Sequence, residues 1–309
     1  MRNTSPEIEI IYNRIVSNSK LFLKKAISEI LIDGHRSLSH EHAVLSCLYV
    51  QMATELAVKA YVIEKEDIRK ILMPKFQKKT DAELEVIFQR NGLHTIKFDL
   101  LKQHIIKKYP SDFDNTDRAH FDKFQTFRNK LVHLNLYLDS QELENLKLEM
   151  IYVIAQVIVR LISQLDFAYD SPTTFYRETL EGTLYDDLLN FEPYQKELTK
   201  VAKTYTGFAY ECVECYQRTF SPVNNRCYFC EADLTLATEY LDCFSCSAKK
   251  AVVYDPLNIA LNGNRINGLC MSCGDRPMVY KCPECNQVKA YYDIKELAGT
   301  CYDGCLSNS

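Results

Sequence analysis

Residues 212–230 read CVECYQRTFSPVNNRCYFC, a stretch that contains two Cys-x-x-Cys turns. The chain of 309 residues has 13 cysteines, and 12 of them lie between Cys212 and Cys305. All seven histidines precede residue 134. This separation predicts two parts with different chemistry, one that holds the histidines and one that holds the thiols.

The 12 clustered thiols form six close pairs, five spaced as Cys-x-x-Cys and the last as Cys-x-x-x-Cys. Two such turns can point four sulfurs at one ion, an arrangement that suits tetrahedral Zn²⁺. Pairing neighbouring turns predicts three structural zinc ions per chain with no clustered thiol left over. The predicted ligand sets are Cys212/Cys215 with Cys227/Cys230, Cys243/Cys246 with Cys270/Cys273, and Cys282/Cys285 with Cys301/Cys305.

Other arrangements of the thiols use the same residues. The spacing also allows the last four turns to pair in an interleaved order, and four thiolates can hold an iron–sulfur cluster. A disulfide framework is disfavoured because Met1–Glu7 has no apolar core of the signal-peptide kind. A catalytic zinc usually keeps an open position and often has a histidine ligand. We therefore expect closed structural sites within a zinc ribbon with short β-hairpins, for which 251–254 and 290–292 are strand-like.

The charge balance limits what the chain can bind. The whole chain carries 37 Lys and Arg against 41 Asp and Glu, and 47% of its residues are hydrophobic, which is typical of a folded soluble protein. Residues 208–309 contain nine basic and 12 acidic residues. Three zinc ions with 12 thiolates would bring this region to about −9. A region with this negative charge is poorly suited to bind nucleic-acid phosphates in general, so we expect it to contact protein or to support a dimer.

Apolar residues recur at helical spacing through the first half of the chain. The helices that we predict from this pattern span 6–32, 40–66, 81–90, 96–108, 116–132 and 140–168. In the second of these, Ser39 is the expected N-cap, and the apolar stripe consists of Leu45, Leu48, Tyr49, Met52, Leu56, Ala60 and Ile63. Short connections favour antiparallel packing in a helical bundle.

Three regions follow from these patterns, and the predicted fold class is mainly α. Residues 1–168 form a helical domain, residues 169–207 a bridging segment and residues 208–309 the cysteine-rich module. Within the bridge we expect short helices over 183–189 and 194–205, separated by a break at Glu192-Pro193. The most apolar stretch, 150–168, is interrupted by polar residues, so we expect no membrane contact and a cytoplasmic protein.

The sharpest catalytic candidate is the segment 127–134, which reads FRNKLVHL. Arg128 and His133 lie five positions apart, and Asn129 directly follows the arginine. On an ideal helix this offset turns the two side chains about 140° apart. A joint site therefore needs the helix to end or bend near His133, or a second copy of the motif. A guanidinium can hold a phosphate and an imidazole can move a proton near neutral pH.

In this motif the sequence resembles the HEPN superfamily, whose ribonuclease members combine a helical bundle with Arg-x(4–6)-His. In those members the residue after the arginine is usually Asn, Asp or His. Arg128, Asn129 and His133 match the pattern at its shortest spacing. The helix expected over 41–64 is also similar to an early helix of the family. The resemblance covers residues 6–168 and does not extend to the cysteine-rich module.

The resemblance implies a metal-independent endoribonuclease that works as a homodimer with one composite site. Attack by the ribose 2′-OH would leave 2′,3′-cyclic phosphate and 5′-OH ends. His133 would act as the acid or base, Arg128 would stabilise the phosphate and Asn129 would position it. Many members act in prokaryotic toxin and antiviral defence systems. A protein activator, an inhibitor or a phage-derived trigger is then an expected partner of the zinc module.

Two other interpretations of the helical domain stay open. Arg128 and His133 can be ordinary helix-surface residues or a helix cap, since this pair often arises by chance. Alternatively, the helical domain serves dimerisation in a non-catalytic zinc-ribbon interaction or RNA-binding protein.

Overall fold

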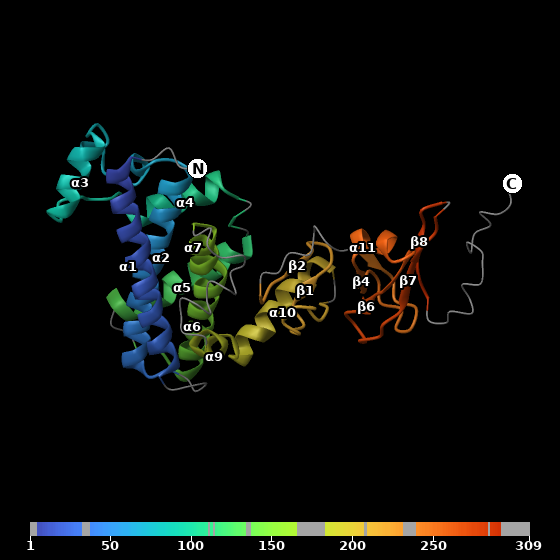
Figure 1. Ribbon diagram of the computed structural model, residues 1–309. Coiled ribbons are helices and arrows are strands. Elements are labelled where there is room, and N and C mark those ends of the chain that lie inside the picture. Colours follow the sequence, from blue (N-terminus) through green and yellow to red (C-terminus); the bar gives the residue numbers. More distant parts are fainter. Residues whose placement is uncertain are drawn as a thin grey trace. The chain divides into compact units, whose positions relative to one another are not determined.

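The computed structural model describes residues 5–32, 38–110, 112–113, 115–133, 137–165, 183–206, 209–230, 239–283 and 285–291. The chain divides into two compact units, Met1–Tyr194 and Gln195–Ser309. The first is helical and the second holds short antiparallel sheets (Figure 1). The boundary falls inside the segment 169–207 that we expected to bridge the two parts.

The described part of the first unit is built mainly from helices (Figure 1). Its helices are α1 (Pro6–Leu31), α2 (His40–Lys65), η1 (Ile68–Lys70), η2 (Pro74–Phe76), α3 (Asp81–Gln89), α4 (Phe98–Lys108), α5 (Asn115–His133), α6 (Ser140–Tyr152), the π-helical η3 (Val153–Ile158), α7 (Val159–Leu165) and α9 (Thr183–Leu189). These bounds agree closely with the helices predicted from the apolar periodicity. The mainly α class is therefore confirmed for this part of the chain.

Local capping explains why the helix ends could be predicted. The Ser39 hydroxyl accepts a hydrogen bond from the His42 amide at the start of α2, so the predicted N-cap is confirmed. The side chain of Thr80 and that of Glu83 form a reciprocal capping box at the start of α3. Helix α3 then stops at Asn91, which takes a positive φ of 56°.

Helix α2 is the central helix, and its packing differs from what its apolar stripe suggests. Its buried residues include several alanines, which let neighbouring helices approach closely, together with large side chains such as Tyr61. Ala43, Ala53 and Ala57 have no exposed surface, whereas Leu48 and Met52 are 36% and 44% exposed. Helix α2 is long and apolar enough to pass a membrane-span test, but 56% of its most apolar window is buried within this unit.

The predicted helix over 140–168 is described as far as Leu165 and is interrupted by a π-helical segment. Helices α6 and α7 continue one another through η3, and every residue of η3 is buried. A π segment in a buried helix re-aims the side chains that follow it, and such segments often occur at functional sites. The 3.6-residue periodicity of the sequence carries no signal for this extra residue per turn.

The connection to the second unit corrects one expectation. Helix α9 spans Thr183–Leu189, as predicted. The predicted break at Glu192-Pro193 is wrong, because both residues lie in the first turn of α10 (Glu192–Thr206). Proline is tolerated there because the first amides of a helix have no intrahelical acceptor.

Three small antiparallel sheets form the framework of the second unit. Their strands are β1 (Phe220–Ser221), β2 (Arg226–Cys227), β3 (Glu239–Leu241), β4 (Val252–Tyr254), β5 (Arg265–Asn267), β6 (Leu269–Cys270), β7 (Met278–Lys281) and β8 (Val288–Tyr291), with α11 (Pro256–Leu261) between β4 and β5. The strand orders are β1-β2, β3-β4-β6 and β5-β7-β8. The short hairpins predicted for this region are therefore present.

The sheets of the second unit share one core rather than forming separate modules. Buried cysteines of different turns contribute to it together with apolar residues such as Phe220, Val252 and Val279. Gly268 is required where β5 leads into β6. A Cβ at this position would lie 2.8 Å from Val252 and 2.9 Å from Val279. The core thus brings several cysteine turns into fixed proximity.

Candidate metal centres and the Arg128 helix

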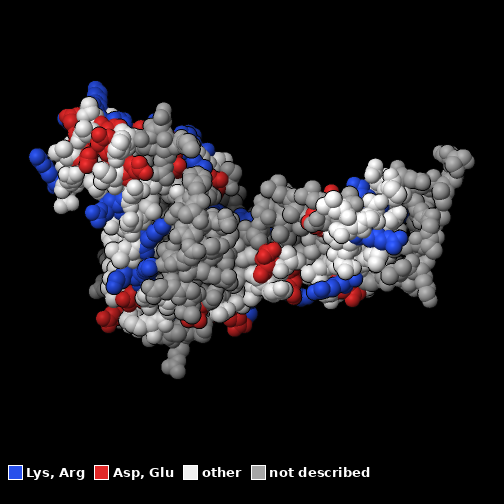
Figure 2. All heavy atoms as spheres, in the orientation of Figure 1, with Lys and Arg blue, Asp and Glu red and all other residues white. Residues whose placement is uncertain are grey.

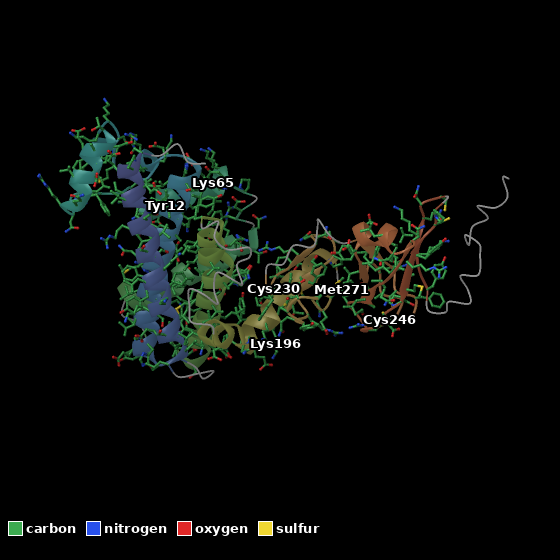
Figure 3. The ribbon with its side chains drawn as sticks, viewed as in Figure 1. Tyr12, Lys65, Lys196, Cys230, Cys246 and Met271 are labelled. Atoms are coloured by element: carbon green, nitrogen blue, oxygen red, sulfur yellow. The ribbon has the colours of Figure 1, made fainter. Side chains whose placement is uncertain are left out.

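Two groups of four cysteines can each hold a metal ion. In each group all four sulfurs lie within 4.8 Å of one another. The first group is Cys212, Cys215, Cys227 and Cys230, and the second is Cys243, Cys246, Cys270 and Cys273. These groups join neighbouring turns, which is the pairing proposed from the spacing. Figure 3 labels one cysteine of each group, Cys230 and Cys246.

The separations between sulfurs fit a tetrahedral thiolate site. The Sγ atoms of Cys212 and Cys230 are 3.8 Å apart, and those of Cys243 and Cys273 are also 3.8 Å apart. A zinc ion with Zn–S bonds of about 2.3 Å in tetrahedral geometry separates its sulfurs by about 3.8 Å. A disulfide would need about 2.05 Å. The measured separations therefore fit four sulfurs around one ion and not a disulfide bond.

Backbone amides prepare these sulfurs to carry negative charge. The amide of Glu214 donates to the Cys212 sulfur at 3.4 Å, and the amide of Ser272 donates to the Cys270 sulfur at the same distance. Hydrogen bonds among the sulfurs of the first group lower the pKa of Cys212, which accepts them, and raise the pKa values of Cys215 and Cys230, which donate to it. A thiolate that accepts hydrogen bonds is stabilised in its charged form, the form that binds metal.

Four of the turns share one backbone geometry. The amide of the first cysteine donates to the carbonyl five residues later in the turns that begin at Cys212, Cys243, Cys270 and Cys282. The residue four positions after that cysteine has a positive φ in each case. The residues at this position are Tyr216 (61°), Ser247 (56°), Gly274 (79°) and Asn286 (58°).

The turn from Cys282 to Gln287 is therefore built like the turns of the two complete groups. Cys285 belongs to it, but Cys301 and Cys305 lie outside the described residues. The structure thus describes half of the third ligand set that the sequence predicts. The common turn geometry shows that this pair, too, is shaped to present two sulfurs to an ion.

The Arg-x4-His motif occupies the C-terminal end of α5. Arg128 lies four residues after the buried Phe124 and three before the buried Leu131, so it belongs to the core-facing stripe of the helix. Its side chain is half-buried and its Nε is shielded from solvent. Burial raises the pKa of the Cys47 thiol to about 12, a shift that the positive charge of Arg128 opposes. Arg128 is thus half-buried on the core-facing side of α5.

The other two motif residues lie close by in the chain. Asn129 is exposed, and its Oδ1 accepts a hydrogen bond from Nη1 of Arg128 at 2.9 Å. His133 is the last residue of α5 before the chain leaves the described residues. The His133 side chain lies outside the described residues.

Sequence reasoning missed a buried polar cluster between α5, α6 and α7. His120 Nδ1 lies 2.6 Å from Glu149 Oε2, and the His120 ring stacks on Tyr152 at 3.7 Å between ring centroids. Arg160 forms an ion pair with the buried Asp117. The partners are 29 and 43 residues apart in the chain, so no local spacing indicates them. Their burial favours a role in fixing helix packing.

No family model, curated protein or solved structure matches this chain.

Proposed function

We propose that the protein is a metal-independent endoribonuclease of the HEPN type that acts as a homodimer. The observation that carries this proposal is the placement of Arg128, which is half-buried, hydrogen-bonded to Asn129 and set five residues before His133 on α5. A guanidinium restrained in this way is oriented before substrate arrives, and orientation is a large part of what catalysis needs.

The proposed chemistry uses the RNA's own 2′-OH as the nucleophile. The 2′ oxygen forms a bond to phosphorus while the bond from phosphorus to the 5′ oxygen breaks. One proton leaves the 2′-OH and another reaches the 5′ oxygen. The imidazole of His133 moves one of these protons, and the guanidinium of Arg128 stabilises the charge on the phosphate. The products carry 2′,3′-cyclic phosphate and 5′-OH ends.

A second copy of the chain explains how the motif forms one site. On a single helix, Arg128 and His133 are turned about 140° apart and do not aim at one point. Two copies of α5 facing each other supply two guanidiniums and two imidazoles to one phosphate. The dimer would therefore provide one histidine for each proton transfer.

The thiol groups have a structural role in this proposal. The first two four-cysteine groups, and a third formed by Cys282 and Cys285 with Cys301 and Cys305, would bind three zinc ions that hold the second unit together. Four sulfurs close each site and leave no open position for substrate. The zinc ions would therefore take no part in RNA cleavage.

The biological role that we propose follows from the toxicity of RNA cleavage to the cell. An enzyme that cuts RNA in the cytoplasm must be restrained, so we propose a toxin or antiviral role with an activator, inhibitor or phage-derived trigger. On the visible face, acidic and basic side chains are interspersed over the described parts of the chain (Figure 2). RNA binding would then depend on a local site and not on the overall charge of the protein.

The test compares RNA cleavage by the full-length protein and three variants in buffer without added divalent metal. His133→Ala and Arg128→Ala should each lower cleavage of total RNA or tRNA by about 100-fold or more. Lys130→Ala is the matched control, because Lys130 lies on the same helix and pairs with Glu142 at 3.0 Å. The control should cleave like the parent. Undiminished cleavage by His133→Ala would refute the catalytic assignment.

A further inference from the structure

A cavity of about 290 Å³ lies between the turns of the two complete cysteine groups. One wall comes from Glu211, Val213 and Tyr216, and the other comes from 269–276. The amide of Glu211 donates to the Met271 carbonyl at 3.0 Å, which joins the two walls. Only one cysteine of the first group and two of the second reach the cavity, so it is neither metal site. Figure 3 shows Met271 between the labelled Cys230 and Cys246.

Tyr216 is the anomalous residue of this cavity. It occupies the positive-φ position of its turn, where the equivalent residues are Ser247, Gly274 and Asn286. Bulky side chains rarely adopt this conformation, because Cβ then approaches the carbonyl oxygen. Tyr216 is also 72% exposed, so burial of its ring in the core does not offset the backbone strain at this position. A strained aromatic residue that lines a cavity points to ligand binding.

The remaining lining offers complementary groups. Val213, Leu269 and Met271 provide an apolar floor. The carboxylate of Glu211 and the guanidinium of Arg276 are exposed at the cavity and form no hydrogen bond or ion pair with the described residues. The cavity therefore combines an aromatic ring, an apolar surface, an acid and a donor.

The charged groups around the cavity determine whether it favours a cation or an anion. The turns 211–218 and 270–276 carry three carboxylates and two guanidinium groups. One guanidinium, that of Arg218, donates to the Ser272 carbonyl at 3.3 Å. Each zinc with four thiolates adds two further negative charges beside the cavity. The net field is negative, so it attracts a cation and repels a phosphate.

We propose that this cavity binds a lysine or arginine side chain from an extended segment of a partner protein. The alkyl stem of the basic side chain would lie on Val213, Leu269 and Met271. Its charged head would contact the Tyr216 ring and the Glu211 carboxylate. Arg276 would donate to a carbonyl oxygen of the peptide backbone. The second unit would thus read a basic peptide, and this inference does not rest on RNA cleavage by the first unit.

The experiment follows the methyl signal of Met271 in the full-length, zinc-loaded protein with ¹³C-labelled methionine methyl groups. The chain has six methionines, and Met271→Leu assigns the relevant signal. The probes are acetylated and amidated Gly-Ser-Xaa-Ser-Gly peptides in which Xaa is arginine, lysine, norleucine or glutamate. A short oligouridylate is a fifth probe, which tests single-stranded RNA as the occupant instead.

The arginine and lysine peptides should shift the Met271 signal saturably at up to millimolar concentration, while the signals of Met52 and Met150 in the first unit stay in place. Tyr216→Asn and Glu211→Gln should each weaken binding about tenfold or more. Tyr216→Asn should not lower the melting temperature, because asparagine tolerates a positive φ. Phe244→Ala is the control, since Phe244 is 85% exposed on a cysteine turn but does not line the cavity.

Three results would overturn the proposal. One is the absence of a saturable Met271 shift with the arginine and lysine peptides. A second is equal binding of the glutamate or norleucine peptide, or tighter binding of the oligouridylate. The third is unchanged affinity in Tyr216→Asn. Because His133→Ala leaves this cavity intact, the peptide measurement and the RNA-cleavage measurement fail independently.

Discussion

The helical unit buries Leu23, Ile27 and Leu146 completely, on helices of 13 to 26 residues. In the cysteine-rich unit the strands are only two to four residues long, and four cysteines are among its buried core residues. Burial of apolar area alone can stabilise the first unit. The second unit has a smaller core, into which its cysteine turns bring thiols that can bind an ion. Such an ion would add to the stability of the unit.

This difference assigns different tasks to the two units. Long packed helices hold a side chain such as Arg128 in a fixed position, as a catalytic group requires. In a cysteine turn, the sulfurs would be fixed by a bound ion, whereas the residues between and after the ligands are exposed. Tyr216 and Phe244 are examples of such exposed residues. On our proposals, the first unit would carry out the chemistry and the second would recognise a partner.

Metal removal should have the largest effect, because it should unfold the second unit and leave the first folded. A chelator should unfold the second unit, because structural zinc contributes about 10–16 kcal/mol to the folding of small zinc domains. Hydrogen exchange should show lost protection in β4 and β7 and retained protection in α1 and α2. Metal analysis should find three zinc ions per chain, and Cys47→Ser should leave that number unchanged. Iron, or fewer than two ions per chain, would contradict the account.

A cavity in the helical core should have the next largest effect. Ile27→Ala removes a fully buried side chain of α1 and should lower the free energy of unfolding by about 2–5 kcal/mol. Chemical denaturation followed by helical circular dichroism measures this loss. Ile10→Ala on the same helix is the control, because Ile10 is 50% exposed. A similar loss in both variants would argue against the described core, as would a loss of zinc in Ile27→Ala.

The strained position of Tyr216 predicts a smaller effect of unusual sign. Tyr216→Asn should stabilise the zinc-loaded second unit by roughly 0.5–1 kcal/mol, because asparagine adopts a positive φ more easily. Gly274→Ala tests the equivalent position in the opposite direction and should destabilise by roughly 1–2 kcal/mol. A Cβ at Gly274 would meet nothing within 4 Å, so backbone strain alone decides this outcome. Destabilisation by Tyr216→Asn would show that the ring is structural.

The smallest predicted effect concerns pH. Burial of Glu66 raises the pKa of its carboxyl, but hydrogen bonds from Lys108, His104 and Tyr109 outweigh burial and lower the pKa overall. The resulting stabilisation is present above the ordinary pKa of about 4.5 and is lost as pH falls through the depressed value. In Glu66→Gln, thermal stability should fall less steeply on acidification.

The control for Glu66 is Glu85→Gln, whose carboxylate accepts from the Gln89 amide on α3. Melting curves from neutral to acidic pH should have the same slope in this control and in the parent. An unchanged slope in Glu66→Gln would mean that the contacts of Glu66 do not favour its charged form.

What the sequence predicted well is what depends on neighbours in the chain. Helix ends at Ser39 and Asn91 follow from capping and from a positive φ, which a few residues decide. The geometry of each cysteine turn follows in the same way, because its own spacing sets it, and the β1-β2 hairpin joins the two turns of the first group. The turns of the second group come together through the pairing of β4 with β6, which are separated by α11 and β5. The bundle-like helical character of the first half follows from periodicity alone.

What the sequence could not predict depends on contacts between distant segments. Helix α2 is apolar on two sides, so its periodicity indicated a helix but not which side faces the core. The contact of His120 with Glu149 arises only when α5 and α6 pack together, because the two residues are 29 positions apart. Tyr216 had a local signal, since it directly follows Cys215, but its strain is visible only in the backbone conformation.

The ends of the RNA fragments test the central claim most directly. The full-length protein is incubated with tRNA in buffer without added divalent metal, and the new 3′ and 5′ ends are identified by mass spectrometry. The account predicts 2′,3′-cyclic phosphate and 5′-OH ends from the parent and none from His133→Ala. Fragments with 3′-OH and 5′-phosphate ends that form only with added Mg²⁺ would contradict it.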